Sequence, residues 1–281
     1  MNQPLEISNK WDKWRLIIMW GDIWTSFTTR NAVQAARRSG CWVVVACVPD
    51  KIVPILDKDF KVLPFWDYWD IDYDSVLWLM NQSHAICFGI GIEAPLSTIS
   101  KIVTRLLDEV WKPIVLDADW VKCIQEQVNI LNERKSRHQI TILTLNTQET
   151  EYVFGSKTPS SDIVSAFSVQ NWVHILLKWP STKVYIPDGS IKNMTTNDCP
   201  EMANAGSGDV LIGLIWWFLA QGRTPLESIL AAVEIRRAAA KYYLSKTGDI
   251  VAQPEDIVDN IRYVIWSLHP MKINSLEDKI S

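Results

Sequence analysis

Residues 204–214 are NAGSGDVLIGL, a glycine-rich turn that runs into an apolar stretch. This pattern predicts a helix over residues 208–221, which Gly222 would end. Glycines at the start of a helix expose backbone N–H groups at the positive end of the helix dipole, which suits a phosphate or a developing oxyanion. Asp209, in the first turn, would then accept a proton from a substrate hydroxyl. The simpler interpretation is a helix N-terminus with a favourable acidic residue, and this segment alone does not decide between the two.

Elsewhere, short apolar runs alternate with amphipathic stretches. We expect strands at 15–20, 42–48, 85–89, 114–116, 140–145 and 173–177, and helices at 26–39, 96–110 and 162–171. Two further helices, at 225–245 and 254–268, make the C-terminal third helical. Nearly all-apolar strands separated by helices predict an α/β fold with a mainly parallel sheet flanked by helices. Ligands of such sheets bind beyond the carboxyl ends of the strands, so the residues after each strand are the candidates for a site.

Two of these strand ends carry acidic or amide side chains. Asp117 and Asp119 follow the strand at 114–116, where they form either a carboxylate pair or a cap of the next helix. Asn146 follows the strand at 140–145, and we expect it to face the same crevice.

A third strand end leads into a polar loop, KWPST at 178–182, and then into a strand at 183–187 that completes a hairpin. One Lys and two hydroxyl residues in such a loop can bind nucleotide phosphates, although many surface loops share this pattern. The charged run NERKSRH at 132–138 is interpreted as a solvated helix end.

The composition favours small-molecule chemistry in a reducing compartment. The 281 residues include 28 Lys plus Arg and 32 Asp plus Glu, a net charge of -4 without a basic block, so we expect neither a nucleic-acid nor a membrane partner. The first 15 residues lack the apolar core of a secretory signal, and the longest apolar run, 210–220, is shorter than a membrane span of ~20 residues. Five scattered cysteines and four histidines show no metal-ligand spacing. A cytoplasmic protein without a protein-held metal is the prediction.

Taken in order, these segments resemble the ribokinase-like fold, and within it the ADP- or ATP-dependent NAD(P)H-hydrate dehydratases. That family carries a Gly-rich loop, G-P-G-L-G, V-L-D-A-D, L-T-P-H-x-x-E, K-G-x-x-T, A-T-G-G-S-G-D-V-L-A-G-I and A-Q-G. The matching segments are WGDIW (20–24), GIGIE (89–93), VLDAD (115–119), LTLNTQE (143–149), KWPST (178–182), ANAGSGDVLIGL (203–214) and AQG (220–222). The resemblance covers residues 15–266 and implies one ribokinase-like, carbohydrate kinase-type domain over 1–281, with its core at about 15–268 and without the family's epimerase domain.

The resemblance also implies an activity, the repair of hydrated NAD(P)H, which carries a hydroxyl at C6 of the nicotinamide ring. Asp209 would take the hydroxyl proton while the terminal phosphoryl group of ADP or ATP passes to that oxygen, and loss of phosphate would restore the ring. Mg²⁺ would bridge the nucleotide phosphates.

By the same resemblance, two groups of residues bind the ligands. The nucleotide would be bound by Lys178, Trp179, Pro180, Ser181, Thr182, Gly206 and Gly208. The hydrate would be bound by Thr28, Glu93, Asn146 and Asp209. The first three of these stand where the family has Ala, Gly and His, whereas Asp209 matches the family motif.

Tryptophan replaces glycine at several of these motifs. Trp20, Trp24, Trp42 and Trp179 each stand where the family has Gly, and the chain has 15 Trp but only 11 Gly, against roughly 20 Gly in an average chain of this length. We expect Trp24 and Trp179 to obstruct the pocket, since Trp lacks the backbone freedom of Gly. One hypothesis is a gene that uses UGA for Gly and was translated with UGA as Trp; the alternative is true divergence. UGG codons at all four positions would exclude the first.

Two other functions fit the same residues. A small-molecule kinase of this fold would phosphorylate a vitamin precursor or a sugar and leave the hydrate unchanged. A non-catalytic relative would bind nucleotide without turnover, and Trp179 and Asn146 are the residues that favour it. The sequence does not choose between ADP and ATP or between NADH and NADPH hydrate, and it is compatible with a homo-oligomer.

Overall fold

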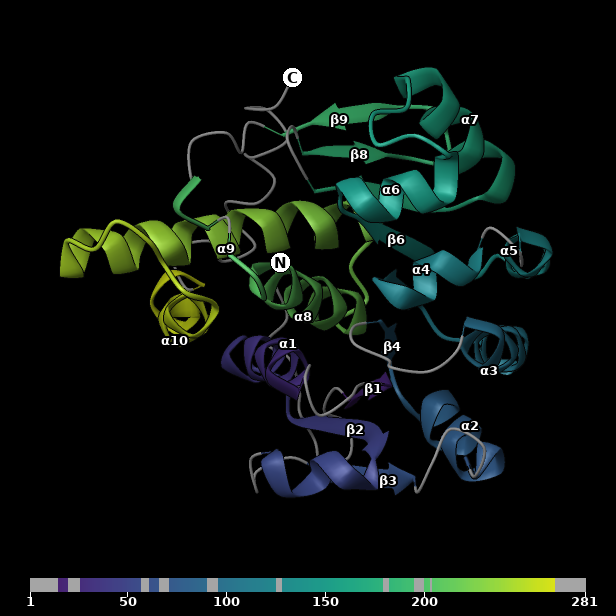
Figure 1. The fold of residues 1–281 in the computed structure, drawn as a ribbon, viewed down its shortest axis with the longest axis horizontal. Helices are drawn as coiled ribbons and strands as arrows, with labels where there is room; N and C mark the ends of the chain where they lie inside the picture. The colour runs from purple at the N-terminus through teal and green to yellow at the C-terminus, as the bar shows by residue number, and fades with distance from the viewer. Residues whose placement is uncertain are drawn as a thin grey trace, which may run out of the picture.

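One nine-stranded sheet organises the part of the chain that the structure describes (Figure 1). This computed structural model describes residues 15–19, 26–56, 61–65, 71–89, 96–124, 128–178, 182–194, 200–202 and 204–265. The strand order is β3-β2-β1-β4-β5-β6-β7-β8-β9. Neighbouring strands from β3 to β7 pair in parallel, and β8 and β9 continue the sheet antiparallel. The mainly parallel α/β prediction is confirmed.

Seven strands confirm the sequence prediction, hairpin strand included. They are β1 (Arg15–Met19), β2 (Val43–Pro49), β4 (Ala85–Phe88), β5 (Ile114–Asp117), β6 (Thr141–Leu145), β7 (His174–Leu177) and β8 (Lys183–Tyr185). The sequence did not predict β3 (Lys61–Phe65) or β9 (Ile191–Asn193), the two edge strands. A proline within β3, Pro64, weakens its strand pattern, and Pro is tolerated there because edge strands need fewer ladder hydrogen bonds.

Four helices cover one face of the sheet: α1 (Ser26–Arg38), α8 (Ser207–Ala220), α9 (Pro225–Thr247) and α10 (Pro254–Val264). Helix α8 is apolar on all sides and packs between α1, α9 and the strands β1, β4 and β5. Its Trp216 is fully buried and donates Nε1–H to the carbonyl of Ala85 in β4 at 3.0 Å. The three predicted C-terminal helices are confirmed, although residues 266–268 of the last lie outside the described ranges.

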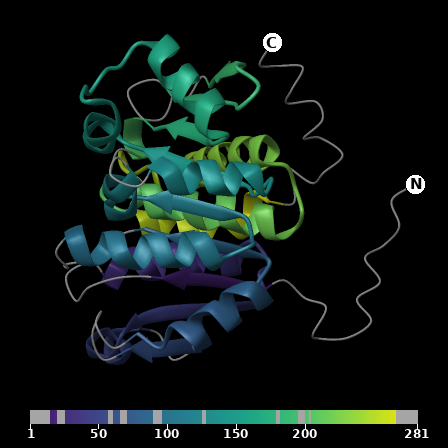
Figure 2. The same ribbon diagram turned by 90° about the vertical axis from the view of Figure 1, so that its right-hand side faces the viewer.

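Six helices cover the other face, which is turned toward the viewer in Figure 2. They are α2 (Tyr73–Gln82), α3 (Leu96–Glu109), α4 (Asp119–Ile124), α5 (Val128–Ser136), α6 (Thr147–Phe154) and α7 (Ser161–Asn171). Two 3-10 helices, η3 (Asp50–Ile55) and η4 (Pro200–Met202), complete the elements in these ranges. Within the ranges given above, none of the helices combines the length and apolar character that a membrane-spanning segment requires.

The prediction that the charged run at 132–138 is a solvated helix end is only partly confirmed. Most of it is exposed at the end of α5, as expected, but Arg134 is buried with 1% of its surface exposed. Its guanidinium donates to Oγ1 of Thr141 and to the carbonyls of Leu107, Val110, Lys112 and Ile140. The prediction of a solvated side chain is therefore wrong for Arg134, which ties α5 to the end of α3 and the start of β6.

Candidate active site

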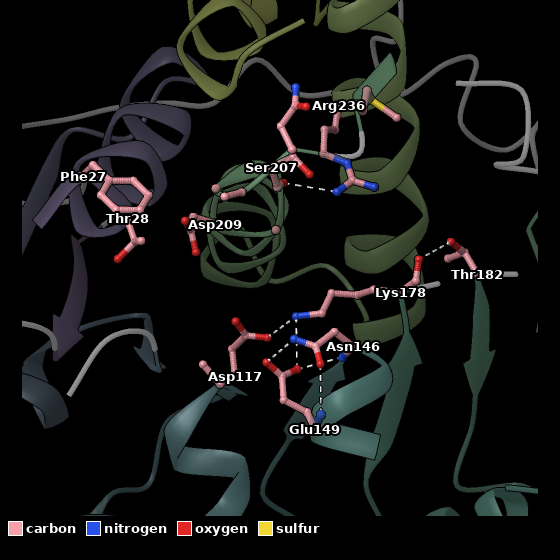
Figure 3. Close-up of a pocket in the computed structure, with 16 residues that line it drawn as sticks. Phe27, Thr28, Asp117, Asn146, Glu149, Lys178, Thr182, Ser207, Asp209 and Arg236 are labelled. Carbon is pink, nitrogen blue, oxygen red and sulfur yellow. Dashed lines mark hydrogen bonds and ion pairs between the residues drawn. The ribbon is translucent and has the colours of Figure 1, made fainter. Parts of the chain in front are cut away.

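A pocket of about 440 Å³ opens at the carboxyl ends of β5, β6 and β7 (Figure 3). Its walls are these strand ends, the first turn of α1, the turn before α8 and one residue of α9. This is the edge of a parallel sheet at which ligands bind. The pocket therefore lies where the sequence placed the candidate site.

The turn before α8 forms one wall. Gly206 is its N-cap with φ 92°, a backbone conformation that favours glycine. A Cβ at this position would also lie only 3.0 Å from Nδ2 of Asn31 and from Cγ of Pro254, so these side chains would have to shift slightly. The amides of Ser207 and Asp209 already donate to the carbonyls of Asn204 and Gly206. The expectation of exposed N–H groups is thus wrong for these two amides, while the positive end of the α8 dipole still points at the pocket.

Asp209 lies in the first turn of α8 and faces the pocket, with 5% of its surface exposed. Burial raises the pKa of its carboxyl well above the usual range, and the charge of Asp117 adds to this, while Lys178 acts against it. A carboxylate whose pKa is raised in this way is a stronger base once it is deprotonated. Asp209 is therefore suited to hold and release a proton at the pocket.

Below Asp209, a lysine lies between two buried carboxylates (Figure 3). Lys178 Nζ is 2.6 Å from Oδ1 of Asp117 and 3.4 Å from Oε2 of Glu149. Thr144 also donates its hydroxyl to Asp117. The carboxylates raise the pKa of Lys178 although burial alone would lower it, so the ammonium stays charged. We refer to Asp117, Glu149 and Lys178 as the charge cluster.

The start of α6 holds Glu149 in this cluster. Asn146 is the N-cap, and its side-chain Oδ1 accepts from the backbone amides of Gln148 and Glu149 at 2.8 and 2.9 Å. In return, the backbone N–H of Asn146 donates to Oε2 of Glu149 at 2.7 Å. This reciprocal arrangement is a capping box, which the sequence N-x-x-E permits. Burial, followed by the charge of Asp117, raises the pKa of Glu149 to about 7.

Arg236 of α9 reaches the same pocket, and sequence reasoning missed it. Its Nη1 donates to the carbonyl of Ser207, the first residue of α8, at 3.1 Å. No motif in the sequence surrounds Arg236. Only the packing of α9 against α8 brings it to the site.

The structure brings together most of the predicted site residues that it describes. Thr28, Asn146, Lys178, Thr182, Gly206, Gly208 and Asp209 all line the pocket. Thr28 lies on the α1 side and Thr182 on the opposite side, where its hydroxyl donates to the carbonyl of Lys178 at 3.1 Å. Glu93, Trp179, Pro180 and Ser181 lie outside the described residues.

Asp117 and Asp119 do not act as a pair. Asp119 is the first residue of α4, bonds Lys122 at 2.7 Å, and lines a neighbouring cavity of about 490 Å³. Ala118 between them has φ 50°, which turns the chain and separates the two side chains. Only Asp117 belongs to the charge cluster.

Of the four tryptophans in the glycine positions, the structure describes Trp42. Its side chain is 53% exposed, it does not line the pocket, and its φ is not positive. The steric argument for glycine therefore finds no support at this position. Trp20, Trp24 and Trp179 lie outside the described residues.

Asp117 and Glu149 are carboxylates of the kind that bind Mg²⁺ jointly with nucleotide phosphates. Within the described ranges, no three acidic, histidine or cysteine side chains are grouped so that they could hold a metal by themselves. The pocket thus suits a Mg²⁺ ion that takes its other ligands from phosphate and water.

The strand order, and a pocket at the start of a buried helix, define a ribokinase-like protein. A ribokinase-like superfamily protein from Enterococcus faecalis matches with a TM-score of 0.75 at 17% identity, over 95% of this chain and 91% of that one. The ADP/ATP-dependent NAD(P)H-hydrate dehydratase from Bacillus subtilis, co-crystallised with ATP and Mg²⁺, matches with a TM-score of 0.73 at 18% identity, over 95% and 93%. At these identities the matches establish the fold.

The chain belongs to the NAD(P)H-hydrate dehydratase family, whose model matches residues 27–262. The ADP-dependent (S)-NAD(P)H-hydrate dehydratase of Listeria monocytogenes is 25% identical over 253 residues, 89% of this chain and 85% of that protein. The bifunctional NAD(P)H-hydrate repair enzyme of Moorella thermoacetica is 25% identical over 250 residues, 84% of this chain. The chain spans only 46% of that longer enzyme. The family resemblance seen in the motifs is confirmed.

Proposed function

We propose that this protein is a carbon–oxygen lyase that dehydrates (S)-NAD(P)H hydrate to NAD(P)H with ADP or ATP as co-substrate. The observation that carries the proposal is the buried Asp209 carboxylate, with its raised pKa, in the first turn of α8 of a dehydratase-family chain. The charge cluster beside it supplies fixed charges of the kind that phosphoryl transfer uses, which supports the proposal. The names of the Listeria and Bacillus relatives supply the nucleotide and the hydrate.

In the proposed reaction, Asp209 accepts the proton of the C6 hydroxyl. The hydroxyl oxygen attacks the terminal phosphorus of the nucleotide, and the bond from that phosphorus to the bridging oxygen breaks, with its electron pair leaving on AMP or ADP. The C6–O bond then breaks as phosphate departs, and loss of a proton at C5 forms the C5–C6 double bond. Bound Mg²⁺ would neutralise phosphate charge during this transfer.

The individual binding roles are part of the proposal. Thr28, Glu93 and Asn146 would contact the hydrate together with Asp209. The nucleotide would be bound by Lys178, Trp179, Pro180, Ser181, Thr182, Gly206 and Gly208. Asp117 and Glu149 would hold the Mg²⁺ ion with the nucleotide phosphates. A cytoplasmic location, a single domain over 1–281 with its core at about 15–268, and assembly into a homo-oligomer are proposed with the function.

The test is recovery of NADH absorbance from (S)-NADH hydrate with ADP or ATP, comparing the chain as written with Asp209→Asn. We expect Asp209→Asn to lower kcat by 10²–10⁴-fold, since it removes the base but keeps the size of the side chain. A version with Trp20, Trp24, Trp42 and Trp179 each changed to Gly is assayed in parallel. Recovery only in that version would support the function and the UGA hypothesis together.

An Asp209→Asn variant as active as the parent would contradict the role of Asp209. Absence of turnover in both versions, with nucleotide binding intact, would favour a non-catalytic relative. Phosphorylation of a sugar or vitamin precursor, with the hydrate unchanged, would favour a kinase.

A further inference from the structure

A second cavity, of about 490 Å³, adjoins the pocket that contains Asp209. Its walls come from α4, from α6 and from the loop that follows α6. Ala118, Asn146 and Glu149 line both spaces, so the two meet at the carboxyl ends of β5 and β6. The proposed function gives this second cavity no role so far.

The pocket at Asp209 is too small for both ligands of the proposed reaction. Its volume of about 440 Å³ falls in the range of ~300–1,000 Å³ that holds one drug-sized ligand. The terminal phosphate of the co-substrate and the nicotinamide ring of the hydrate have to meet there. The hydrate is a dinucleotide, however, and its second half is a complete adenylate. This adenylate half must therefore lie outside the pocket.

The placement of Asn146 indicates where the adenylate half goes. Asn146, proposed to contact the hydrate, lies where the pocket and the second cavity meet. Among the described residues proposed for the co-substrate, Lys178, Thr182, Gly206 and Gly208 line the pocket, and none of the four lines the second cavity. The second cavity thus lies on the side of the hydrate rather than on the side of the co-substrate.

An aromatic ring in the second cavity suits an adenine. Tyr152 of α6 lines this cavity and is 50% exposed. Nζ of Lys122 lies 5.1 Å from the ring centroid and is itself held by Asp119 at 2.7 Å, which helps to fix the ring. Nucleobases stack on such rings whatever the base. Asp119 and Gln148, which also line the cavity, offer hydrogen-bond partners for ribose hydroxyls.

We infer that the second cavity binds the adenylate half of the hydrate, with the ring of Tyr152 stacked on its adenine. This inference rests on the proposed function. NADH, the product, carries the same adenylate half, whereas reduced nicotinamide mononucleotide lacks it. The ring of Tyr152 should therefore contribute to the binding of NADH and not to that of the mononucleotide.

Calorimetric titration of the intact chain with NADH and with reduced nicotinamide mononucleotide tests the inference. We expect Tyr152→Ala to weaken NADH binding roughly 5- to 30-fold, the effect of losing one stacked base, and to change mononucleotide binding less than about twofold. Tyr152→Phe keeps the ring and is expected to bind NADH like the parent. Equal loss in Tyr152→Phe and Tyr152→Ala would overturn the stacking role of the ring.

Tyr263 provides the matched control. It lies on α10, is 52% exposed, stacks on Tyr242 and lines neither cavity. Tyr263→Ala is expected to bind NADH and the mononucleotide like the parent. Equal loss of both ligands in Tyr152→Ala would overturn the inference, because it would indicate a structural effect through α6. Weaker ADP binding with NADH binding unchanged would also overturn it, since the cavity would then hold the adenosine of the co-substrate.

The two proposals can fail separately. Hydrate repair by the parent, with Tyr152→Ala indistinguishable from Tyr263→Ala in the NADH titration, would overturn the role of the second cavity and leave the function standing. A selective loss of NADH binding in Tyr152→Ala, without hydrate repair by the parent, would support the adenylate site and overturn the lyase activity. A parent chain that binds neither NADH nor ADP would overturn both.

Discussion

Trp172 ends α7 in a backbone conformation that glycine favours. Its φ and ψ are 56° and 44°, and its amide donates to the carbonyl of Ser168. Helices α6 and α9 end in the same left-handed conformation, but at Gly155 and Gly248. The left-handed region costs a non-glycine residue roughly 1–2 kcal/mol. Trp172 is thus a further position, besides those seen in the motifs, where glycine is the expected residue.

Comparison of Trp172→Gly with Trp172→Ala tests this strain. Both variants lose the indole, which is about half exposed, so the difference between them reports the backbone. We expect Gly to be more stable than Ala by about 1 kcal/mol in urea unfolding, the reverse of the usual order in a helix. Ala166→Gly, at an exposed site within α7, is the control and should cost about 1 kcal/mol. An Ala variant at least as stable as the Gly variant would contradict the argument.

At the scale of elements, the contact of α8 with α1 fixes the site. A Cβ on Gly213 would lie 2.2 Å from the carbonyl oxygen of Ala32, so the two helices approach as closely as backbones allow. This close approach, and the bond from Trp216 to β4, hold the first turn of α8 over the strand ends. The position of Asp209 therefore depends on a residue one turn further along the helix.

We expect Gly213→Ala to destabilise the protein by about 3 kcal/mol, because backbone must move to admit the methyl group. Gly208→Ala is the control on the same helix, since its Cβ would meet only Nζ of Lys178 at 3.9 Å. Thermal unfolding should show a lower Tm for Gly213→Ala and no decrease for Gly208→Ala. Equal stability of the two variants would show that α1 and α8 can separate without cost.

At the scale of the whole molecule, the charge cluster links stability to pH. The folded-state pKa of Glu149 is about 7, above the value of about 4.3 for an exposed Glu. Between these values the folded protein binds the proton and the unfolded chain does not, so this group lowers stability as the pH rises. Burial also lowers the pKa of His174 to about 4. Between this value and about 6.5 the unfolded chain binds the proton and the folded protein does not, so His174 makes stability rise with pH and opposes the effect of Glu149 in that range.

The contribution of His174 cancels in the difference between the unfolding free energies of Glu149→Gln and the parent, because both proteins contain His174. We expect the stability of Glu149→Gln relative to the parent to rise by about 2 kcal/mol from pH 5 to pH 8, measured by urea unfolding at each pH. Asp162→Asn, an exposed carboxylate on α7, is the control and should run parallel to the parent. A constant difference between Glu149→Gln and the parent would show that Glu149 ionises normally.

The sequence by itself determined most strands, the helical C-terminal third and the start of α8. These follow from patterns within 5 to 20 neighbouring residues, and hydrophobic periodicity reports such local order. Hydrophobic periodicity does not reveal the two edge strands, because the proline in β3 and the exposed residues of β9 give no apolar pattern. The site residues carried by motifs, such as Asn146 and Asp209, were found for the same local reason.

Only the tertiary structure decided which charges meet. Lys178 and Asp117 are 61 residues apart and pair because β5 and β7 end at the same edge, on either side of β6. Arg134 is buried because carbonyls from three separate segments converge on it, although its neighbours suggested solvent. Arg236 reaches the pocket through the packing of α9 on α8. Burial and pairing depend on distances across the fold, which no local pattern of residues contains.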